Sequence, residues 1–542
     1  MPSLYPHEVR KIAQGAGAAS GFAGFFFPSL RARGLGEEKP VPPYSAMVYK
    51  DGNEVRAEDW KGRKIASGEA GVDDASVIQS AINAVEAELA QSSREIIPKI
   101  VFRGTFSLKN TIKITKMIHL EGGKFEIQSP LGFEVFDGDK TDWNPQYVGF
   151  ERMAVVGNGN DAFACRYCGN WYFSAVKMFD VKRGLILERT WGDTQTMIAS
   201  RIVGNPSDGE GLIHAITPEN GCTNSFTIIG STFWCSNDNA AVFKFEPQAE
   251  NSAVTNLTFY DVYTEGYGDF FAGLVQGSRF FITQSTMRGN GFLFNLEEGK
   301  NLDIQIAGRQ GNLYFKALEN SKIWIQKIMP KRTDKPLLAI EEGAFNFIEI
   351  ETAKEAVNSD VDYIQIGASG KWYDAIVIKN SRFWNTIGCR SVISFGNAGR
   401  SLGCKVVNCV FRNVNSIPSY PSCYALYYQG KKQIVENCEF WELNKYEVTN
   451  NLSGFVFKGI KEGHAKFENS GTATFSGDGS TTQFSIAHDL ISEPSKVQVT
   501  PMTEDAAGDF YVTKDATNIY VNYLSAPPSG SNNVKLSWYA EV

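Results

Sequence analysis

Acidic residues in turn-like segments are the first side chains that could do chemistry. Five of them lie in glycine- or asparagine-rich stretches: Asp208, Glu210, Asp238, Glu265 and Asp269. Glycosidases use two carboxyl groups roughly 5–10 Å apart, and residues on adjacent strands of a parallel sheet, about 4.8 Å apart, can meet that spacing. These acids are therefore candidate catalytic residues. The alternative is that they are solvated or cap turns.

Aromatic residues form a second candidate site, for a ligand or for a subunit interface. Trp234, Trp384 and Trp441 occupy the same place in a repeated pattern, and strand alternation turns them outward. Outward tryptophans could stack on sugar rings, but large exposed apolar patches usually mark interfaces, and we favour an interface. A further candidate for ligand contact consists of Tyr260, Tyr263 and Tyr267.

Metal and cofactor motifs are not evident. Cys165 and Cys168 form a C-x-x-C, but a zinc or redox site would need a second Cys/His pair or a βαβ unit, and the sequence shows neither. Two neighbouring thiols in a tight turn fit better. Phosphate-binding loops, dinucleotide motifs and hydrolase nucleophile motifs are also absent. No cofactor and no metal are therefore predicted.

A repeated segment must position the candidate side chains. The pattern is a polar residue or glycine, then Ser or Cys, any residue, a large apolar residue and another large side chain. It occurs at 230–234, 284–288, 380–384, 408–412 and 437–441. Each copy follows an apolar β run, and a period of roughly 20–50 residues indicates a solenoid. Strands without intervening helices exclude a doubly wound α/β fold.

Stacking of equivalent positions completes the interpretation. Asn380, Asn408 and Asn437 fall at bends where asparagine tolerates left-handed geometry. The predicted buried columns are Ser381–Cys409–Cys438 and Phe383–Phe411–Phe440. The sequence therefore predicts an all-β fold, a parallel β-helix, in which most cysteines are small buried fillers rather than disulfide partners.

The segment before the solenoid has two parts. Residues 1–47 are rich in Gly, Pro and basic residues and are interpreted as an arm, with a weak signal peptide as the alternative. Its aromatic cluster, Phe25-Phe26-Phe27, would dock into a partner protein. Residues 48–95 are predicted to hold a linker and a capping helix near 75–90. The apolar face of that helix is Ile78, Ala81, Ile82, Val85 and Leu89.

The β-helix is predicted to cover residues 96–465, and the composition changes soon after it. Short β-prone runs alternate with turns over residues 470–542, and this segment contains no cysteine. Five or six short strands in such a length favour a small antiparallel β-sandwich with its own core.

Two segments resemble known families. Residues 71–82 (GVDDASVIQSAI), with 101–106 (VFRGTF) after them, resemble the entry motif of pectate-lyase-like right-handed parallel β-helix proteins, which is common in viral tailspikes. Arg103 replaces the usual proline. The stretches 479–486, 494–497, 504–512 and 526–530 are similar to a small β domain at the ends of virus and phage tail fibres.

This resemblance implies a virion spike or fibre subunit, a homotrimer whose N-terminal arm is held by a virion tail or baseplate protein. Polygalacturonase-like members carry Asn-x-Asp, Asp-Asp, His-Gly and Arg-x-Lys sets. These sets do not transfer, because no His-Gly exists here and Asp73-Asp74 belongs to the helix entry.

The expected function is attachment, outside the cell, to a host-surface glycan or glycoprotein. The alternative is a spike-borne depolymerase that cleaves surface polysaccharide by hydrolysis or β-elimination, and a third option is a secreted cellular glycosidase. The net charge of −7 speaks against nucleic acid as a partner. No apolar run reaches the ~18 residues of a membrane span.

Overall fold

The structure, a computed structural model, describes residues 44–542 except 92–96, 137, 139–146, 192–194, 218–222, 249–253, 283, 288–290, 308–310, 329–332, 354–360, 369–370, 385–389, 397–399, 403, 413–423, 429–432, 442–447, 452–453 and 461–465. The arm residues Phe25, Phe26 and Phe27 lie outside the described residues. Contacts divide the chain into two compact units, the first made of Met1–Asn205, Ser225–Phe233 and Tyr260–Tyr263, the second of Pro206–Asn224, Trp234–Phe259 and Thr264–Val542. Within the described residues, no helix is long and apolar enough to cross a membrane.

Three antiparallel strands open the first unit, where the sequence predicts a linker. They are β1 (Ala46–Asp51), β2 (Glu54–Asp59) and β3 (Lys64–Glu69), and β1 also pairs in parallel with β4 (Lys99–Leu108). In β2, only Val55 and Ala57 are buried. A strand with so many charged residues resembles a linker in composition, which explains the difference from the prediction.

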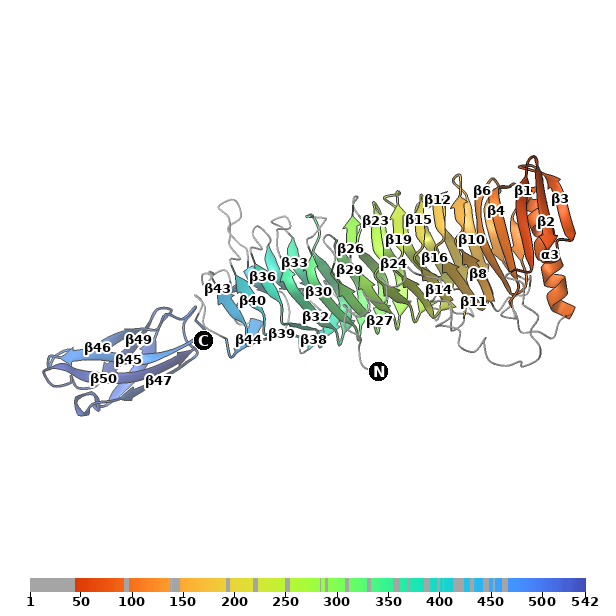
Figure 1. Cartoon of the computed structure of the whole chain (residues 1–542). Helices are drawn as coiled ribbons and strands as arrows, with labels where there is room; N and C mark the ends of the chain where they lie inside the picture. The colour runs from red at the N-terminus through yellow and green to blue at the C-terminus, as the bar shows by residue number, and fades with distance from the viewer. Residues whose placement is uncertain are drawn as a thin grey trace. The chain divides into compact units, whose positions relative to one another are not determined.

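The helix α3 (Asp74–Gln91) packs against β1 to β4 (Figure 1). Its predicted apolar face is buried at Ile78, Ala81, Ile82 and Val85, while the side chain of Leu89 lies outside the described residues. Its first residue is fully buried: the Asp74 carboxylate accepts the backbone N–H of Gly71 (2.9 Å) and of Ser107 (2.7 Å) and pairs with Lys50 Nζ (2.8 Å). Asp74 thereby joins the helix start to the first strands.

The polar face of α3 binds the neighbouring strand edge. Gln79 accepts the backbone N–H of Lys113 and donates to its carbonyl oxygen (2.8 and 2.9 Å). Glu86 accepts the backbone N–H groups of Thr115 and Lys116 (2.9 and 3.0 Å). These side chains satisfy backbone groups that the end of a stacked sheet would otherwise leave without partners.

The rest of the first unit consists of parallel strands in two sheets (Figure 1). One sheet continues from β4 through β6 (Ile118–Ile127), β8 (Tyr147–Glu151), β9 (Ala154–Val156), β11 (Asn170–Ser174), β12 (Lys177–Val181), β14 (Gln195–Ile198), β15 (Arg201–Gly204) and β18 (Phe226–Ile229). The other holds β5 (Ile112–Ile114), β7 (Leu131–Val135), β10 (Asp161–Arg166) and β13 (Leu185–Glu188). Three strands contribute residues to both units: β19 (Thr232–Cys235), β22 (Thr258–Tyr260) and β23 (Tyr263–Gly266).

The second unit repeats this arrangement. One sheet holds β25 (Arg279–Ile282), β26 (Gln284–Met287), β28 (Asp303–Ile306), β30 (Lys322–Ile328), β32 (Phe347–Ala353), β35 (Val377–Lys379), β36 (Arg382–Trp384), β39 (Lys405–Val407), β40 (Val410–Arg412), β42 (Gln433–Glu436), β43 (Glu439–Trp441) and β44 (Phe455–Lys458). The other holds β16 (Gly211–Thr217), β17 (Thr223–Asn224), β20 (Ala241–Pro247), β21 (Val254–Thr255), β24 (Asp269–Gln276), β27 (Phe294–Lys300), β29 (Leu313–Glu319), β31 (Leu338–Ala344), β33 (Asp362–Ile366), β34 (Trp372–Asp374), β37 (Ser391–Phe395), β38 (Arg400–Leu402) and β41 (Tyr424–Tyr428). The predicted parallel β-helix is confirmed.

Left-handed bends separate consecutive strands. Asn380, Asn408 and Asn437 have φ angles of 52°, 52° and 53°, as the sequence predicts. The residue after each bend points inward and forms the predicted column Ser381–Cys409–Cys438, all with 0% exposure. The phenylalanine column also forms, with ring centroids 5.1 Å apart from Phe383 to Phe411 and again from Phe411 to Phe440.

The six described cysteines are buried and form no disulfide, as predicted for fillers: Cys165, Cys168, Cys235, Cys404, Cys409 and Cys438. Cys222, Cys389 and Cys423 lie outside the described residues. A hydrogen bond with Cys168 and burial raise the pKa of the Cys165 thiol.

The C-terminal residues form the predicted antiparallel sandwich. One sheet pairs β45 (Glu468–Gly477), β50 (Gly530–Glu541) and β47 (Lys496–Pro501); the other pairs β46 (Gln483–Ala487), β49 (Asn518–Tyr523) and β48 (Phe510–Lys514). A single turn of 3₁₀ helix, η4 (Glu504–Ala506), lies between β47 and β48. Ile519, Val521 and Leu536 belong to the shared core, and all three are fully buried.

The column Ser381–Cys409–Cys438 yields a first prediction. Ser381 Oγ accepts the buried backbone N–H of Ile350 (2.9 Å) and donates to the carbonyl of Lys379 (2.9 Å). Ser381→Ala leaves that N–H without an acceptor, so we expect the free energy of unfolding to fall by about 1–3 kcal/mol in denaturant titrations. Ser381→Cys is the matched control, because cysteine fills the same column at Cys409 and Cys438. This variant should lose less unfolding free energy than Ser381→Ala. Equal losses would contradict this role for the hydroxyl.

The sandwich yields a prediction about pH. Backbone N–H groups of Thr517 and Asn518 (both 2.7 Å) and the hydroxyl of Tyr520 (2.8 Å) bind the Asp515 carboxylate and hold its pKa well below its usual range. A carboxyl with a lowered pKa in the folded state stabilises the fold above its unfolded pKa of about 4, and loses this effect as the pH falls through the folded pKa.

We therefore expect Asp515→Ala to lower the melting temperature of the full chain at pH 7, with the difference from wild type shrinking between pH 4 and pH 2. Differential scanning calorimetry over this range measures both values. A difference that stays constant with pH would show that the charged carboxylate is not responsible.

Candidate functional site

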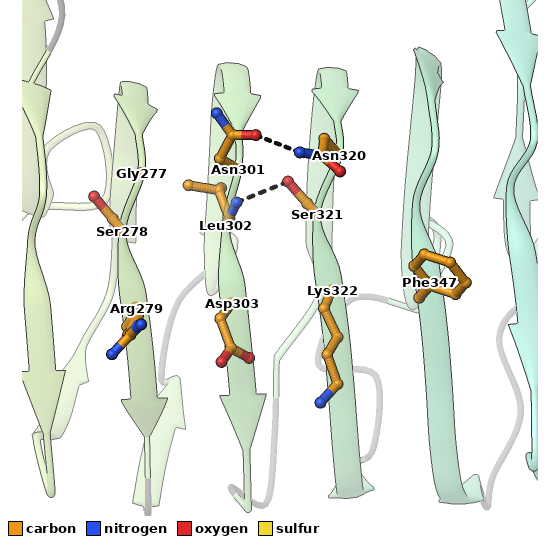
Figure 2. A pocket seen from close by; sticks show the side chains of 10 residues that line it. All are labelled: Gly277, Ser278, Arg279, Asn301, Leu302, Asp303, Asn320, Ser321, Lys322 and Phe347. Atoms are coloured by element: carbon orange, nitrogen blue, oxygen red, sulfur yellow. Dashed lines mark hydrogen bonds between the residues drawn. The ribbon is translucent and has the colours of Figure 1, made fainter. Parts of the chain in front are cut away.

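An open groove of about 420 Å³ crosses four adjacent strands of the second unit, β25, β28, β30 and β32 (Figure 2). Ten residues line it: Gly277, Ser278, Arg279, Asn301, Leu302, Asp303, Asn320, Ser321, Lys322 and Phe347. They come from the bend before each strand and from the strand's first residues. The same local sequence, repeated along the stack, therefore builds the whole groove.

The bends set the upper edge of the groove as drawn in Figure 2. Gly277, Asn301 and Asn320 have φ angles of 58°, 54° and 45°. Asn320 Nδ2 donates to Asn301 Oδ1 at 2.6 Å, so the two amides form a ladder along the stack. The remaining amide groups of this exposed pair face solvent and can bind polar ligand atoms.

The next positions alternate between the core and the groove. Ser321 is buried, and its Oγ accepts the backbone N–H of Leu302 at 3.0 Å (Figure 2). One residue later the side chains point outward, because successive residues of a strand face opposite sides. The strand register places Arg279, Asp303, Lys322 and Phe347 in one outward row across the four strands.

The row carries two cations, Arg279 and Lys322. Among the described residues, no carboxylate lies within 4.0 Å of the charged nitrogens of Arg279 or Lys322, although Asp303 stands on the strand between them. The Asp303 carboxylate instead accepts a hydrogen bond from Gln305 Nε2 at 3.3 Å. Asp303 is the single carboxylate among the ten lining residues.

An exposed aromatic ring, Phe347, ends the row, and a second one, Phe345, precedes it by two residues in the chain. Phe347 is 46% exposed, and Lys379 Nζ lies 5.5 Å from its ring centroid. Phe345 is 61% exposed and adopts a φ of 56°. A left-handed conformation is uncommon for a bulky residue, and its counterparts at the preceding bends are Asn320 and Asn301. An apolar ring stands here where the two preceding coils place an amide and the next coil places Ala375 (φ 47°).

The predicted acids lie elsewhere, mostly in turns that they hold together. Asp208 accepts hydrogen bonds from the side-chain amides of Asn237 (2.9 Å) and Asn239 (3.3 Å) on the next turn. Glu210 accepts the backbone N–H of Ser207 in its own turn (3.0 Å). Asp269 accepts from the Phe292 backbone (2.7 Å) and the Asn295 amide (2.7 Å). Asp208 and Glu210 thus act as turn-capping side chains, whereas Asp269, the first residue of β24, binds the start of the following coil.

Two further candidate acids complete that group. Asp238 is exposed in the turn between β19 and β20, next to the two asparagines that bind Asp208. Glu265 is half-buried on β23. A catalytic role for any of the five acids stays a prediction.

The three predicted tryptophans do not follow one another directly on successive strands. The register aligns Trp384, Arg412 and Trp441 on successive strands, so an arginine separates the two tryptophans. Trp441 is 42% exposed and its Nε1 donates to Glu439 (3.0 Å), while the side chain of Trp384 lies outside the described residues. Trp234 is half-buried on β19. Of the tyrosines, Tyr267 is exposed, and Tyr260 and Tyr263 are half-buried.

The groove residues are not among the candidates predicted from the sequence. Asn301, Ser321 and Phe347 fit the repeat, but the repeat alone does not say which outward side chains become neighbours. One available signal is Phe345, a phenylalanine at a bend position that holds Asn or Gly in the three preceding coils.

No family model matches the chain, and no curated protein matches it. Among solved structures, the chain is similar to the tailspike protein of E. coli bacteriophage HK620 in complex with a pentasaccharide (11% identity, 90% of this chain and 92% of that chain, TM-score 0.39). A mutant of that tailspike in complex with a hexasaccharide gives 11% identity, coverage of 89% and 92%, and a TM-score of 0.37. PfbA, a surface adhesin of Streptococcus pneumoniae, gives 11% identity, coverage of 67% and 90%, and a TM-score of 0.35.

The left-handed backbone conformation of Phe345 yields a prediction. Phe345→Asn places at this bend the residue that the two preceding coils use, and asparagine tolerates φ > 0 better than phenylalanine. Because the ring is mostly exposed, little burial is lost. We expect the free energy of unfolding to rise by about 1 kcal/mol, measured by denaturant titration. Asn320→Phe, the reverse change at the adjacent bend, should lower the free energy of unfolding. A lower free energy of unfolding in Phe345→Asn would contradict the inference that the backbone at Phe345 is strained.

Proposed function

We propose that the chain is the subunit of a surface-attachment spike that binds a glycan in the groove formed by β25, β28, β30 and β32. The observation that carries the proposal is the combination in one groove of an exposed ring, Phe347, with a row of polar side chains. Sugars offer both an apolar face of C–H groups and a rim of hydroxyls. Amphipathic ligands of this kind suit a site with few polar groups placed around an aromatic side chain.

The groove favours binding over cleavage. Glycosidases require a pair of carboxyl groups roughly 5–10 Å apart, and the lining includes one carboxylate, that of Asp303. Depolymerase activity at the loop acids remains the alternative function. It would appear as the release of reducing ends or unsaturated products from a bound polysaccharide, and it would be lost on Asp→Asn changes at Asp208 or Asp269.

The assembly is part of the same proposal. Residues 71–82 resemble the entry motif of pectate-lyase-like β-helix proteins, which is common in viral tailspikes, and this supports a virion spike or fibre subunit that acts at the host surface. The subunit would form a homotrimer, and the N-terminal arm would attach it to a tail or baseplate protein. The exposed Trp441, aligned with Arg412 and Trp384, is the candidate surface for contact between subunits.

The proposal predicts the effect of removing the exposed ring. Phe347→Ala should weaken glycan binding about 5–10-fold, because stacking on an aromatic ring contributes about 1 kcal/mol, with no fall in melting temperature. Binding is measured on an array of bacterial surface polysaccharides and quantified by calorimetry.

Trp60→Ala is the matched control, since Trp60 is 44% exposed but belongs to the first unit. It should bind like wild type. Failure of the wild-type chain to bind any polysaccharide of the array, or equal weakening by both variants, would overturn the proposed function.

A further inference from the structure

We infer that the groove selects an acidic saccharide, whose sugar carboxylates bind Lys322 and Arg279 while a sugar hydroxyl donates to Asp303. This inference rests on the proposed function and names the chemistry of its ligand. The three side chains stand in register on adjacent strands, Arg279 opposite Asp303 and Asp303 opposite Lys322 (Figure 2).

Neither cation forms an ion pair among the described residues, although pairing does occur close by. In the same coils, lysines of the other sheet are paired: Lys300 lies 3.0 Å from Glu319, and Lys316 lies 2.7 Å from Glu297. The chain as a whole has seven more acidic than basic residues. In this row two cations flank one carboxylate, so the row has a net positive charge that attracts an anion.

Asp303 limits which anions fit. It lies one strand from each cation, about 4.8 Å away along the sheet, so a ligand with dense negative charge would meet a repelling carboxylate between the two attracting groups. A ligand that alternates carboxylates with hydroxyls matches the row of positive, negative and positive charge. Charge repulsion of the wrong ligand is an ordinary source of specificity.

The row also predicts which part of the ligand each cation binds. Lys322 pairs in register with Phe347, so a sugar stacked on that ring presents its carboxylate to Lys322. Arg279 lies two strands from Lys322, about 9–10 Å along the sheet, and binds the carboxylate of a later sugar in the chain. Arginine can bind a carboxylate through two parallel hydrogen bonds.

The test uses the full chain and uronic-acid oligosaccharides of two to eight residues, each beside its carboxyl-reduced counterpart. Carboxyl reduction keeps the ring and removes the charge. We expect it to weaken binding at least 10-fold. Lys322→Gln should weaken binding of all the acidic probes about 10-fold, whereas Arg279→Gln should weaken the longer probes more than the shortest one.

Lys177→Gln is the matched control, because Lys177 is exposed on β12 in the first unit and has no acidic partner among the described residues. It should bind like wild type. If acidic and reduced probes bind equally, and Phe347→Ala weakens both, the inference is overturned while the proposed function stands. If neither kind of probe binds, and the polysaccharide array also shows no binding, both are overturned.

Discussion

The left-handed bend, together with the side chain that follows it, is the constraint on which the rest of the structure depends. A strand in a parallel stack pairs its backbone groups with the coils before and after it, but a bend interrupts that pairing. Asparagine or glycine accepts the positive φ. The next residue, as in Ser381 or Ser321, points inward and supplies an acceptor to a backbone N–H of the preceding coil. A side chain of the next coil thereby provides the hydrogen bond that the backbone lacks near each bend, and the coils remain in register.

The same requirement explains the start of the stack. A first coil has no preceding coil to pair with, and α3 supplies the missing partners through polar side chains. Asp74 is fully buried yet binds two backbone N–H groups and Lys50, and Glu86 binds two more N–H groups. Unpaired, such buried groups would cost about 1–3 kcal/mol each. Asp74 and Glu86 therefore serve the backbone at the start of the stack.

The sequence predicts the inward half of this fold well and the outward half poorly. Inward columns repeat because they must fill one core, so Asn380, Ser381 and Phe383 predict the stack of their counterparts directly. Outward residues carry no such repeat. The number of residues between stacked positions also varies, from 21 for Leu257 and Ser278 to 19 for Leu302 and Ser321 and 25 for Ser321 and Asn346. Without the register, Arg279, Asp303 and Lys322 cannot be recognised as neighbours.

Stability and recognition are thus carried by different faces of the same strands, and Phe345 is where their requirements conflict. The stack requires positive φ at this bend, which favours the asparagine found at 301 and 320. The residue present is a phenylalanine whose ring is mostly exposed and buries little surface. Neither backbone geometry nor core packing favours this choice. Strained backbone positions cluster at functional sites, so this bend is a candidate for a functional role. Phe345 lies one coil after Asn320 and two residues before Phe347, which lines the groove.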